Sequence, residues 1–140
     1  MKEFHFKIQC GDFSADLALG GDCSLYALAQ FIIKTVGFDF DHSFQFCDNL
    51  KNPYRSEERY TLFADMGDGD PGDLSVKNTP LSAVFKPRRK MLFHFDYGDD
   101  WFFVVTCTAV IESAAKRPFK KVIETQGTPP VQYPGEEDPG

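Results

Sequence analysis

Three carboxylates lie close together at Asp96, Asp99 and Asp100, on either side of Gly98. Acids at this spacing can bind a divalent cation or work as an acid–base pair. The alternative is turn chemistry, in which Gly98 takes a positive φ and the Asp side chains accept hydrogen bonds from backbone amides. We favour the turn, because acidic turns are common. Asp96 is the exception, since it needs a partner if it is buried within a strand.

A second candidate is His42, which follows Asp39 and Asp41. A His–Asp pair at the edge of a cleft can titrate near neutral pH and exchange protons. The alternative is a histidine at a helix-to-strand corner that hydrogen-bonds to local backbone. We favour the corner, because no second ligand or nucleophile lies at a recognisable spacing. Whether His42 and Asp96 meet across a sheet stays open at this point.

Two charged segments carry weaker signals. The acidic loop at residues 65–73 has the composition of a calcium loop but lacks the EF-hand order of ligands, so we expect a solvated loop. Basic residues with exposed aromatics can hold nucleic acid. They are Lys86, Arg88, Arg89, Lys90, Lys116, Arg117, Lys120 and Lys121. The net charge of −6 disfavours nucleic acid as a partner.

Other chemical signatures are missing from the sequence. It has no Walker phosphate loop, no dinucleotide fingerprint and no legible Ser/His/Asp or Cys/His arrangement. The cysteines form no C-x-x-C pair, so we expect small buried side chains in a reducing cytoplasm; they are Cys10, Cys23, Cys47 and Cys107. The first residues lack an apolar leader, and no run is long enough to span a membrane. We expect a cytoplasmic protein with no metal, no cofactor and no membrane partner.

Two strands must position the acidic turn. Alternating apolar residues on both sides of Gly98 predict a β-hairpin within residues 91–111. A two-residue loop at Gly98 and Asp99 places Asp96 opposite Trp101. A three-residue loop instead gathers on one face Phe93, Phe95, Tyr97, Trp101, Phe103 and Val105. We favour the two-residue loop, because both faces of the second strand carry apolar residues.

A helix must precede the His42 corner. Ser24 is a good N-cap, the apolar residues of 25–36 follow helical spacing, and Gly37 suits a left-handed C-terminal cap. Strands are expected at residues 4–8, 13–19, 43–47 and 60–64, a helical turn at 81–85, and a strand or extended arm near residue 122.

The composition is that of one folded domain. The chain has 140 residues, 42% of them hydrophobic, with 15 Phe. Each buried aromatic removes about 150–250 Å² from water, which is enough for a substantial core. We expect an α+β fold, with a mostly antiparallel twisted sheet, one long helix packed across it and a second short helix. The domain is expected to cover residues 1–131, followed by a mobile acidic C-terminal tail at residues 132–140.

Several motifs together are similar to those of a known family. They are the Gly37-Phe38 corner leading to His42, the turn Phe95-Asp96-Tyr97-Gly98-Asp99-Asp100-Trp101, the Pro-x-x-x-Val stretch at 118–122 and the Gly-x-Pro-Pro run at 127–130. This pattern resembles the plasmid pRiA4b ORF-3-like proteins, which occur on plasmids and in mobile elements. The resemblance implies the fold and no particular activity. The family often has Trp at the position of Phe38 and His at that of Phe103, so any site that uses this His is incomplete here.

We therefore expect a binding or interaction module with an unknown protein or small-molecule partner. Its candidate surface comprises Phe38, Asp39, His42, Asp96, Asp99, Asp100 and Trp101. One alternative is a small metal-dependent or hydrolase-like enzyme that uses His42 with one of the turn acids. Another is a mobile-element accessory protein that contacts nucleic acid through residues 86–90.

Overall fold

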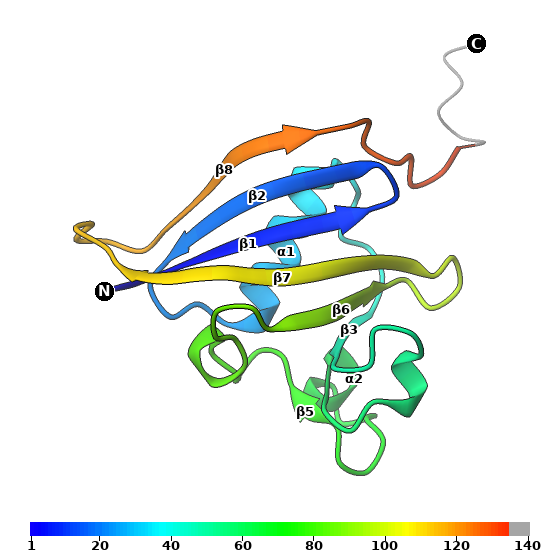
Figure 1. The fold of residues 1–140 in the computed structure, drawn as a ribbon. Coiled ribbons are helices and arrows are strands. Elements are labelled where there is room, and N and C mark those ends of the chain that lie inside the picture. The colour runs from blue at the N-terminus through cyan, green and yellow to red at the C-terminus, as the bar shows by residue number, and fades with distance from the viewer. Residues whose placement is uncertain (135–140) are drawn as a thin grey trace.

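A computed structural model describes residues 1–134 of the chain, and its strands join into one sheet (Figure 1). Eight strands lie in the order β5-β4-β3-β6-β7-β1-β2-β8. The β4–β5 pair is parallel and the other neighbouring pairs are antiparallel. The strands are β1 (Lys2–Cys10), β2 (Phe13–Gly20), β3 (Phe44–Cys47), β4 (Arg59–Thr61), β5 (Leu74–Ser75), β6 (Lys90–Phe95), β7 (Trp101–Glu112) and β8 (Phe119–Gln126).

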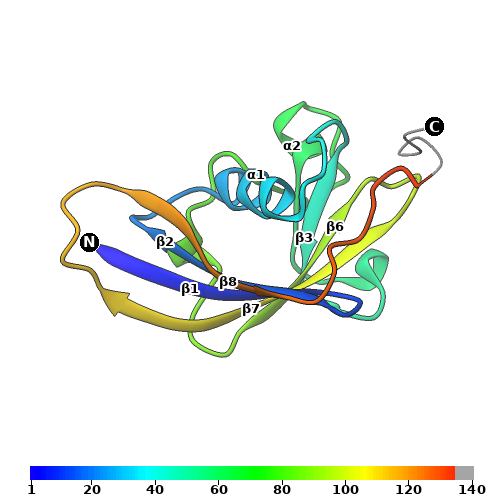
Figure 2. The same cartoon turned by 90° about the horizontal axis from the view of Figure 1, so that it is seen from above.

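The fold is mostly sheet, and the expected α+β class with one long helix packed across the sheet is wrong. Helix α1 (Leu25–Val36) has 12 residues and lies on one side of the sheet (Figure 2). A helix of this length extends only about 18 Å, whereas eight strands at their usual spacing extend roughly 34 Å. The second helix, α2 (Leu62–Asp65), has four residues. Because β4 and β5 pair in parallel, the sheet is mixed.

The local signals of α1 are confirmed. Ser24 Oγ accepts a hydrogen bond from the Ala27 amide at 3.1 Å, which caps the first turn. Gly37 adopts the left-handed conformation at φ 88°, and the amides of Gly37 and Phe38 both donate to the Ile33 carbonyl. This paired C-terminal bond turns the chain sharply out of the helix. The turn directs the following residues toward the end of β3, where the His42 corner forms.

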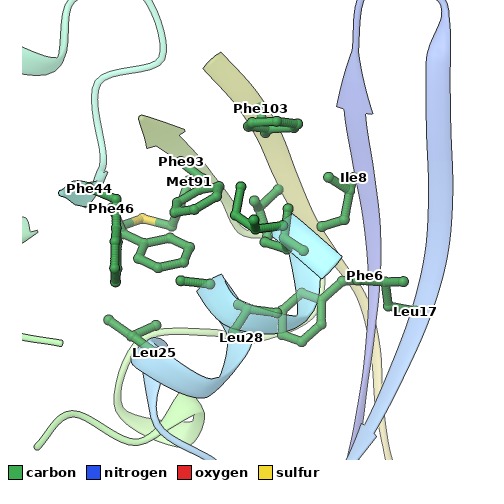
Figure 3. Close-up of a cluster of buried hydrophobic side chains, with 14 of the residues drawn as sticks. Phe6, Ile8, Leu17, Leu25, Leu28, Phe44, Phe46, Met91, Phe93 and Phe103 are labelled. Atoms are coloured by element: carbon green, nitrogen blue, oxygen red, sulfur yellow. The ribbon is translucent and has the colours of Figure 1, made fainter. Parts of the chain in front are cut away.

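Aromatic side chains form the centre of the core, between α1 and the sheet (Figure 3). Phe93 lies in the middle of this cluster, with its ring centroid 4.8 Å from that of Phe46 and 5.6 Å from those of Phe44 and Phe103. Each of these four side chains is fully buried. Leu25 and Leu28 of α1 close the cluster from above the sheet. The predicted apolar face of the helix is therefore confirmed.

The β6–β7 hairpin follows the register that we did not favour. Phe95 pairs with Trp101 and Phe93 pairs with Phe103, so one aromatic face continues across both strands. The expected positive φ at Gly98 is also wrong, because Asp96 and Asp100 adopt it instead, at 67° and 53°. Asp tolerates this conformation better than most residues do. The bond from the Asp100 amide to the Asp96 carbonyl then encloses the three residues 97–99.

Three other local predictions have mixed outcomes. The strand expected at 60–64 ends at Thr61, whose hydroxyl caps α2 by accepting from the Ala64 amide at 3.0 Å. The helical turn expected at 81–85 is a 3₁₀ turn at Leu81–Ala83. The arm near residue 122 is a full strand, β8, which pairs with β2. The tail boundary at residue 132 stays a prediction, and residues 135–140 lie outside the described part of the chain.

Candidate functional site

The turn after β6 is built around Asp96. Its side chain is nearly buried, at 4% exposure of the residue. Asp96 Oδ1 accepts hydrogen bonds from the amides of Gly98 at 3.0 Å and Asp99 at 3.2 Å. The Asp96 amide donates to the Ser43 carbonyl, and its own carbonyl accepts from the Asp100 amide at 2.6 Å. One carboxylate oxygen thus supports the turn, as expected of an Asp in turn chemistry.

The second oxygen of Asp96 faces His42. The distance from Asp96 Oδ2 to His42 Nε2 is 3.3 Å, so these two residues, 54 positions apart in the sequence, do meet. The His42 side chain is more than one-third exposed, whereas that of Asp96 is not. His42 also lies edge-on to the ring of Phe95, with centroids 6.1 Å apart. The pair therefore stands at the rim of the aromatic core, with access to solvent on the histidine side.

Tyr133 completes a hydrogen-bonded chain at this rim. Tyr133 Oη donates to Asp41 Oδ2 at 2.8 Å, and Tyr133 Oη lies 2.8 Å from His42 Nε2. Because the tyrosine proton is directed to Asp41, the His42 ring must donate from Nε2 to Tyr133 Oη. Desolvation at the corner, followed by the hydrogen bond to Asp41, raises the pKa of Tyr133 to about 12. Tyr133 is thus held as the neutral phenol.

Gln132 binds the C-terminal segment to the backbone of the corner. Gln132 Oε1 accepts from the Asp39 amide at 2.7 Å, and Gln132 Nε2 donates to the Asp39 carbonyl at 3.2 Å. The same nitrogen lies 3.2 Å from Asp41 Oδ1. Gln132 is 6% exposed. Because the Gln132 side chain pairs with both backbone groups of Asp39, it fixes residues 132–133 against the segment that contains Asp39. The corner and residues 132–133 therefore form one unit.

Phe38 and Trp101 form the apolar base of the same region. Their ring centroids are 4.9 Å apart in an edge-to-face arrangement, which favours aromatic pairs. Phe38 is buried and Trp101 is half-buried. The Trp101 Nε1 group is sealed from solvent and has no hydrogen-bond partner among residues 1–134. These two residues therefore hold the corner against the hairpin, with one polar group left unsatisfied.

Asp100 points to the other face of the sheet, where it meets a residue that the sequence analysis missed. Asp100 Oδ1 lies 2.6 Å from His94 Nε2, and His94 Nδ1 lies 2.9 Å from Gln45 Nε2. With an ionised Asp100, His94 carries its proton on Nε2 and accepts from Gln45 at Nδ1. His94 is fully buried. Its alternation with Phe93 and Phe95 was the one available signal, since it predicts a polar side chain on the opposite face.

The seven candidate residues therefore do not form one cluster. Asp96, His42 and Asp39 join the network on the corner side, and Asp100 joins His94. The carboxylate of Asp99 is exposed and takes part in no hydrogen bond or ion pair within residues 1–134. The same part of the chain holds no group of three potential metal-binding side chains. The arrangement allows proton sharing through His42 and leaves the Asp99 carboxylate free.

The acidic loop at 65–73 is tied down by its own contacts. Asp65 accepts hydrogen bonds from the Ser75 hydroxyl and from the amide of Val76, the latter at 2.9 Å. Arg59 Nη2 lies 3.1 Å from Asp73 and 3.4 Å from Asp70. These acids therefore organise the connection between β4 and β5.

No helix of residues 1–134 combines the length and the apolar character needed to cross a membrane.

Comparisons with known proteins point to one family. Residues 15–136 match the sequence model of the family described as plasmid pRiA4b ORF-3-like protein. Among solved structures, a protein of unknown function from Methanosarcina mazei Go1 is similar, with a TM-score of 0.64 and 16% sequence identity. The similarity covers 86% of this chain and 67% of the other. At this identity the likeness concerns the fold alone. No curated protein matches the chain.

Proposed function

We propose that this chain, which belongs to the plasmid pRiA4b ORF-3-like family, is an interaction module that binds a basic segment of another protein. The proposed contact region is called the acidic corner. It comprises Phe38, Asp39, His42, Asp96, Asp99 and Trp101, with Asp41 and Tyr133 beside them; the seventh candidate, Asp100, lies on the opposite face with His94.

The observation that carries this proposal is the network that joins three distant segments. Gln132 pairs with both backbone groups of Asp39, and Tyr133 bridges Asp41 and His42. His42 in turn faces Asp96 of the turn. A surface whose residues are already fixed loses little conformational entropy when a partner binds, and this favours affinity.

The charge of the acidic corner supports a basic partner. Asp39, Asp41 and Asp99 are exposed there, and His42 is the one basic side chain in the group. The carboxylates of Asp39 and Asp99 take part in no hydrogen bond or ion pair within residues 1–134, so they are available to Lys or Arg of a partner. Such complementarity mainly raises the association rate and the specificity.

One distance favours the alternative of an acid–base enzyme, namely the 3.3 Å between His42 Nε2 and Asp96 Oδ2. Both groups already have protein partners, however. Asp96 Oδ1 receives two backbone amides, and His42 Nε2 is within hydrogen-bond distance of Tyr133. Four cavities of about 340–440 Å³ are lined by neither His42 nor Asp96. This supports recognition over catalysis at the pair.

We also infer a cytoplasmic location. The four cysteines are free thiols. Cys47 and Cys107 are buried, and Cys10 and Cys23 are half-buried. Unpaired cysteines are typical of a reducing compartment.

The proposal is tested by quantitative capture from a cell lysate with three baits. They are the wild type, the double variant Asp39→Asn/Asp99→Asn, and the control Glu57→Gln/Glu124→Gln, which removes the same charge elsewhere. We expect partners rich in Lys and Arg on the wild type and the control, lost from the double variant and released by salt. Capture of the same proteins by all three baits would contradict the proposal.

A further inference from the structure

A cavity of about 370 Å³ opens on the face of the sheet that points away from α1. Its floor is formed by Gln45 of β3 and Thr61 of β4, whose neighbours Phe44, Phe46 and Tyr60 belong to the core. Because side chains alternate along a strand, the floor residues face the opposite side. The cavity is separate from the acidic corner, since none of the corner residues lines it. Its size is within the range of small-ligand sites.

Three aromatic rings line this cavity: Tyr54, Phe63 and Tyr97. Tyr97 stacks on Phe63 with centroids 5.6 Å apart and planes 25° from parallel. Tyr54 is 65% exposed and Phe63 is 36% exposed, which is unusual for rings that could pack in a core. Burial raises the pKa of the Tyr97 hydroxyl, so this ring stays neutral. The π faces of such rings attract cations.

An unpaired acceptor lies in the floor. Gln45 is 1% exposed, and its Nε2 is committed to His94 Nδ1 at 2.9 Å. Gln45 Oε1 receives no hydrogen bond within residues 1–134, yet it is not among the side-chain atoms sealed from solvent. It therefore reaches the cavity that Gln45 lines. Gln45 Nε2 donates to His94, which Asp100 holds in place, and this bond orients the carbonyl oxygen of Gln45 as the free acceptor.

The charges around the cavity favour a cation. Asp68, Asp70 and Asp73 line one side, and Arg59 is the one basic residue of the wall. Arg59 is already paired with Asp70 and Asp73, at 3.4 Å and 3.1 Å. Three carboxylates against one guanidinium leave the cavity with a formal charge of −2. This negative field repels an anion and attracts a cation.

We propose that this cavity binds a small organic cation with a methylated ammonium head. The aromatic rings receive the weakly hydrated methyl groups, Gln45 Oε1 accepts from any remaining N–H, and Asp68 balances the charge. A methylated head suits the site better than a bare ammonium, because the three aromatic rings offer faces for methyl groups and no strong hydrogen-bond acceptors for N–H. This site is additional to the acidic corner and does not depend on the proposed function.

The test is a titration of the full chain with tetramethylammonium, followed by backbone amide chemical shifts. We expect saturable shifts at Thr61, Gly69 and Tyr97, with none for tert-butanol, a neutral molecule of similar size. Tyr54→Leu should weaken binding roughly two- to fivefold, since an exposed cation–π contact contributes about 0.5–1 kcal/mol. Asp68→Asn should weaken binding by up to about fivefold, since an exposed ion pair contributes about 0.2–1 kcal/mol. Both residues are exposed, so the fold should tolerate these changes.

Phe31→Leu on α1 is the matched aromatic control and should leave the affinity unchanged. The proposal is overturned if tert-butanol binds as well as tetramethylammonium. It is also overturned if the shifts appear at Asp39 and Asp99, or if Tyr54→Leu and Asp68→Asn both bind as tightly as the wild type. These outcomes are distinct from a failed lysate capture, which concerns the corner residues alone.

Discussion

Asp96 and Asp100 belong to one turn but serve opposite sides of the sheet. Asp96 Oδ2 lies 3.3 Å from His42 Nε2 on the corner side, and Asp100 Oδ1 lies 2.6 Å from His94 Nε2 on the cavity side. The backbone links the two residues directly, since the Asp100 amide donates to the Asp96 carbonyl. Both have positive φ, so their side chains leave the strands in directions that a regular hairpin does not provide. One turn therefore supports both proposed sites.

Asp96→Asn should destabilise the protein much less than Asp96→Ala. Asn tolerates the positive φ of this position, and its amide oxygen can still accept from the Gly98 and Asp99 amides. Ala cannot accept these bonds and is strained, so we expect a loss of about 2–3 kcal/mol. Urea unfolding of both variants measures the difference. Equal losses would mean that the charge near His42, not the turn, is what Asp96 supplies.

Trp101→Phe should change the free energy of unfolding by less than about 1 kcal/mol. The substitution loses some buried apolar area, but it also removes a sealed N–H that has no partner within residues 1–134. Trp101→Leu, which removes the ring stacked edge-to-face on Phe38, should cost more. Because Trp101 is the single Trp of the chain, unfolding should be followed by circular dichroism. A large loss in Trp101→Phe would show that Nε1 does bond, for example to a buried water.

Gly127→Ala should weaken the attachment of β8. A Cβ at Gly127 would lie 2.1 Å from the Asp12 carbonyl oxygen, and the residue has φ +79°. Backbone cannot move aside as a flexible side chain does, so we expect a loss of at least about 2 kcal/mol. Gly11→Ala is the control, because it has φ +59° but no atom within 4 Å of the new Cβ. Thermal unfolding of the two variants separates the clash from the strain, and equal melting temperatures would contradict the clash.

The contribution of Tyr133 should be lost at alkaline pH. Its pKa is raised from the usual 10 to about 12, so folding favours the neutral phenol. The stabilisation is complete below the unfolded pKa and disappears as pH rises from 10 to about 12. Tyr133→Phe should be less stable than the wild type at neutral pH, and the gap should close across this range. Urea unfolding as a function of pH measures it, and a gap that widens with pH would refute the assignment.

Local signals predicted the elements that depend on neighbouring residues. Ser24 and Gly37 mark the ends of α1 because each satisfies backbone groups within a few positions. The hairpin register was wrong because it depends on Asp96 adopting a positive φ, which no spacing reveals. The predicted α+β class with one long helix packed across the sheet was also wrong, since a 12-residue helix covers only part of an eight-stranded sheet.

Contacts between distant segments were beyond the sequence. His94 lies in an apolar run, and nothing in that run predicts Asp100 and Gln45 as its partners. Gln132 lies among Pro, Gly and acidic residues, and nothing in that composition predicts that its side chain pairs with the Asp39 backbone. The meeting of His42 and Asp96 was raised as an open question, and folding brings them within 3.3 Å.

The order of the strands also determines where the sheet could grow. One edge strand, β5, has two residues and offers almost no ladder to a second chain. The other, β8, has eight residues, most of them exposed, and its outer hydrogen-bonding groups have no strand beside them in the described chain. Lys120 and Lys121 lie on this edge, where repulsion between like charges discourages edge-to-edge pairing. The two lysines therefore act against extension of the sheet by a second chain at its longer free edge.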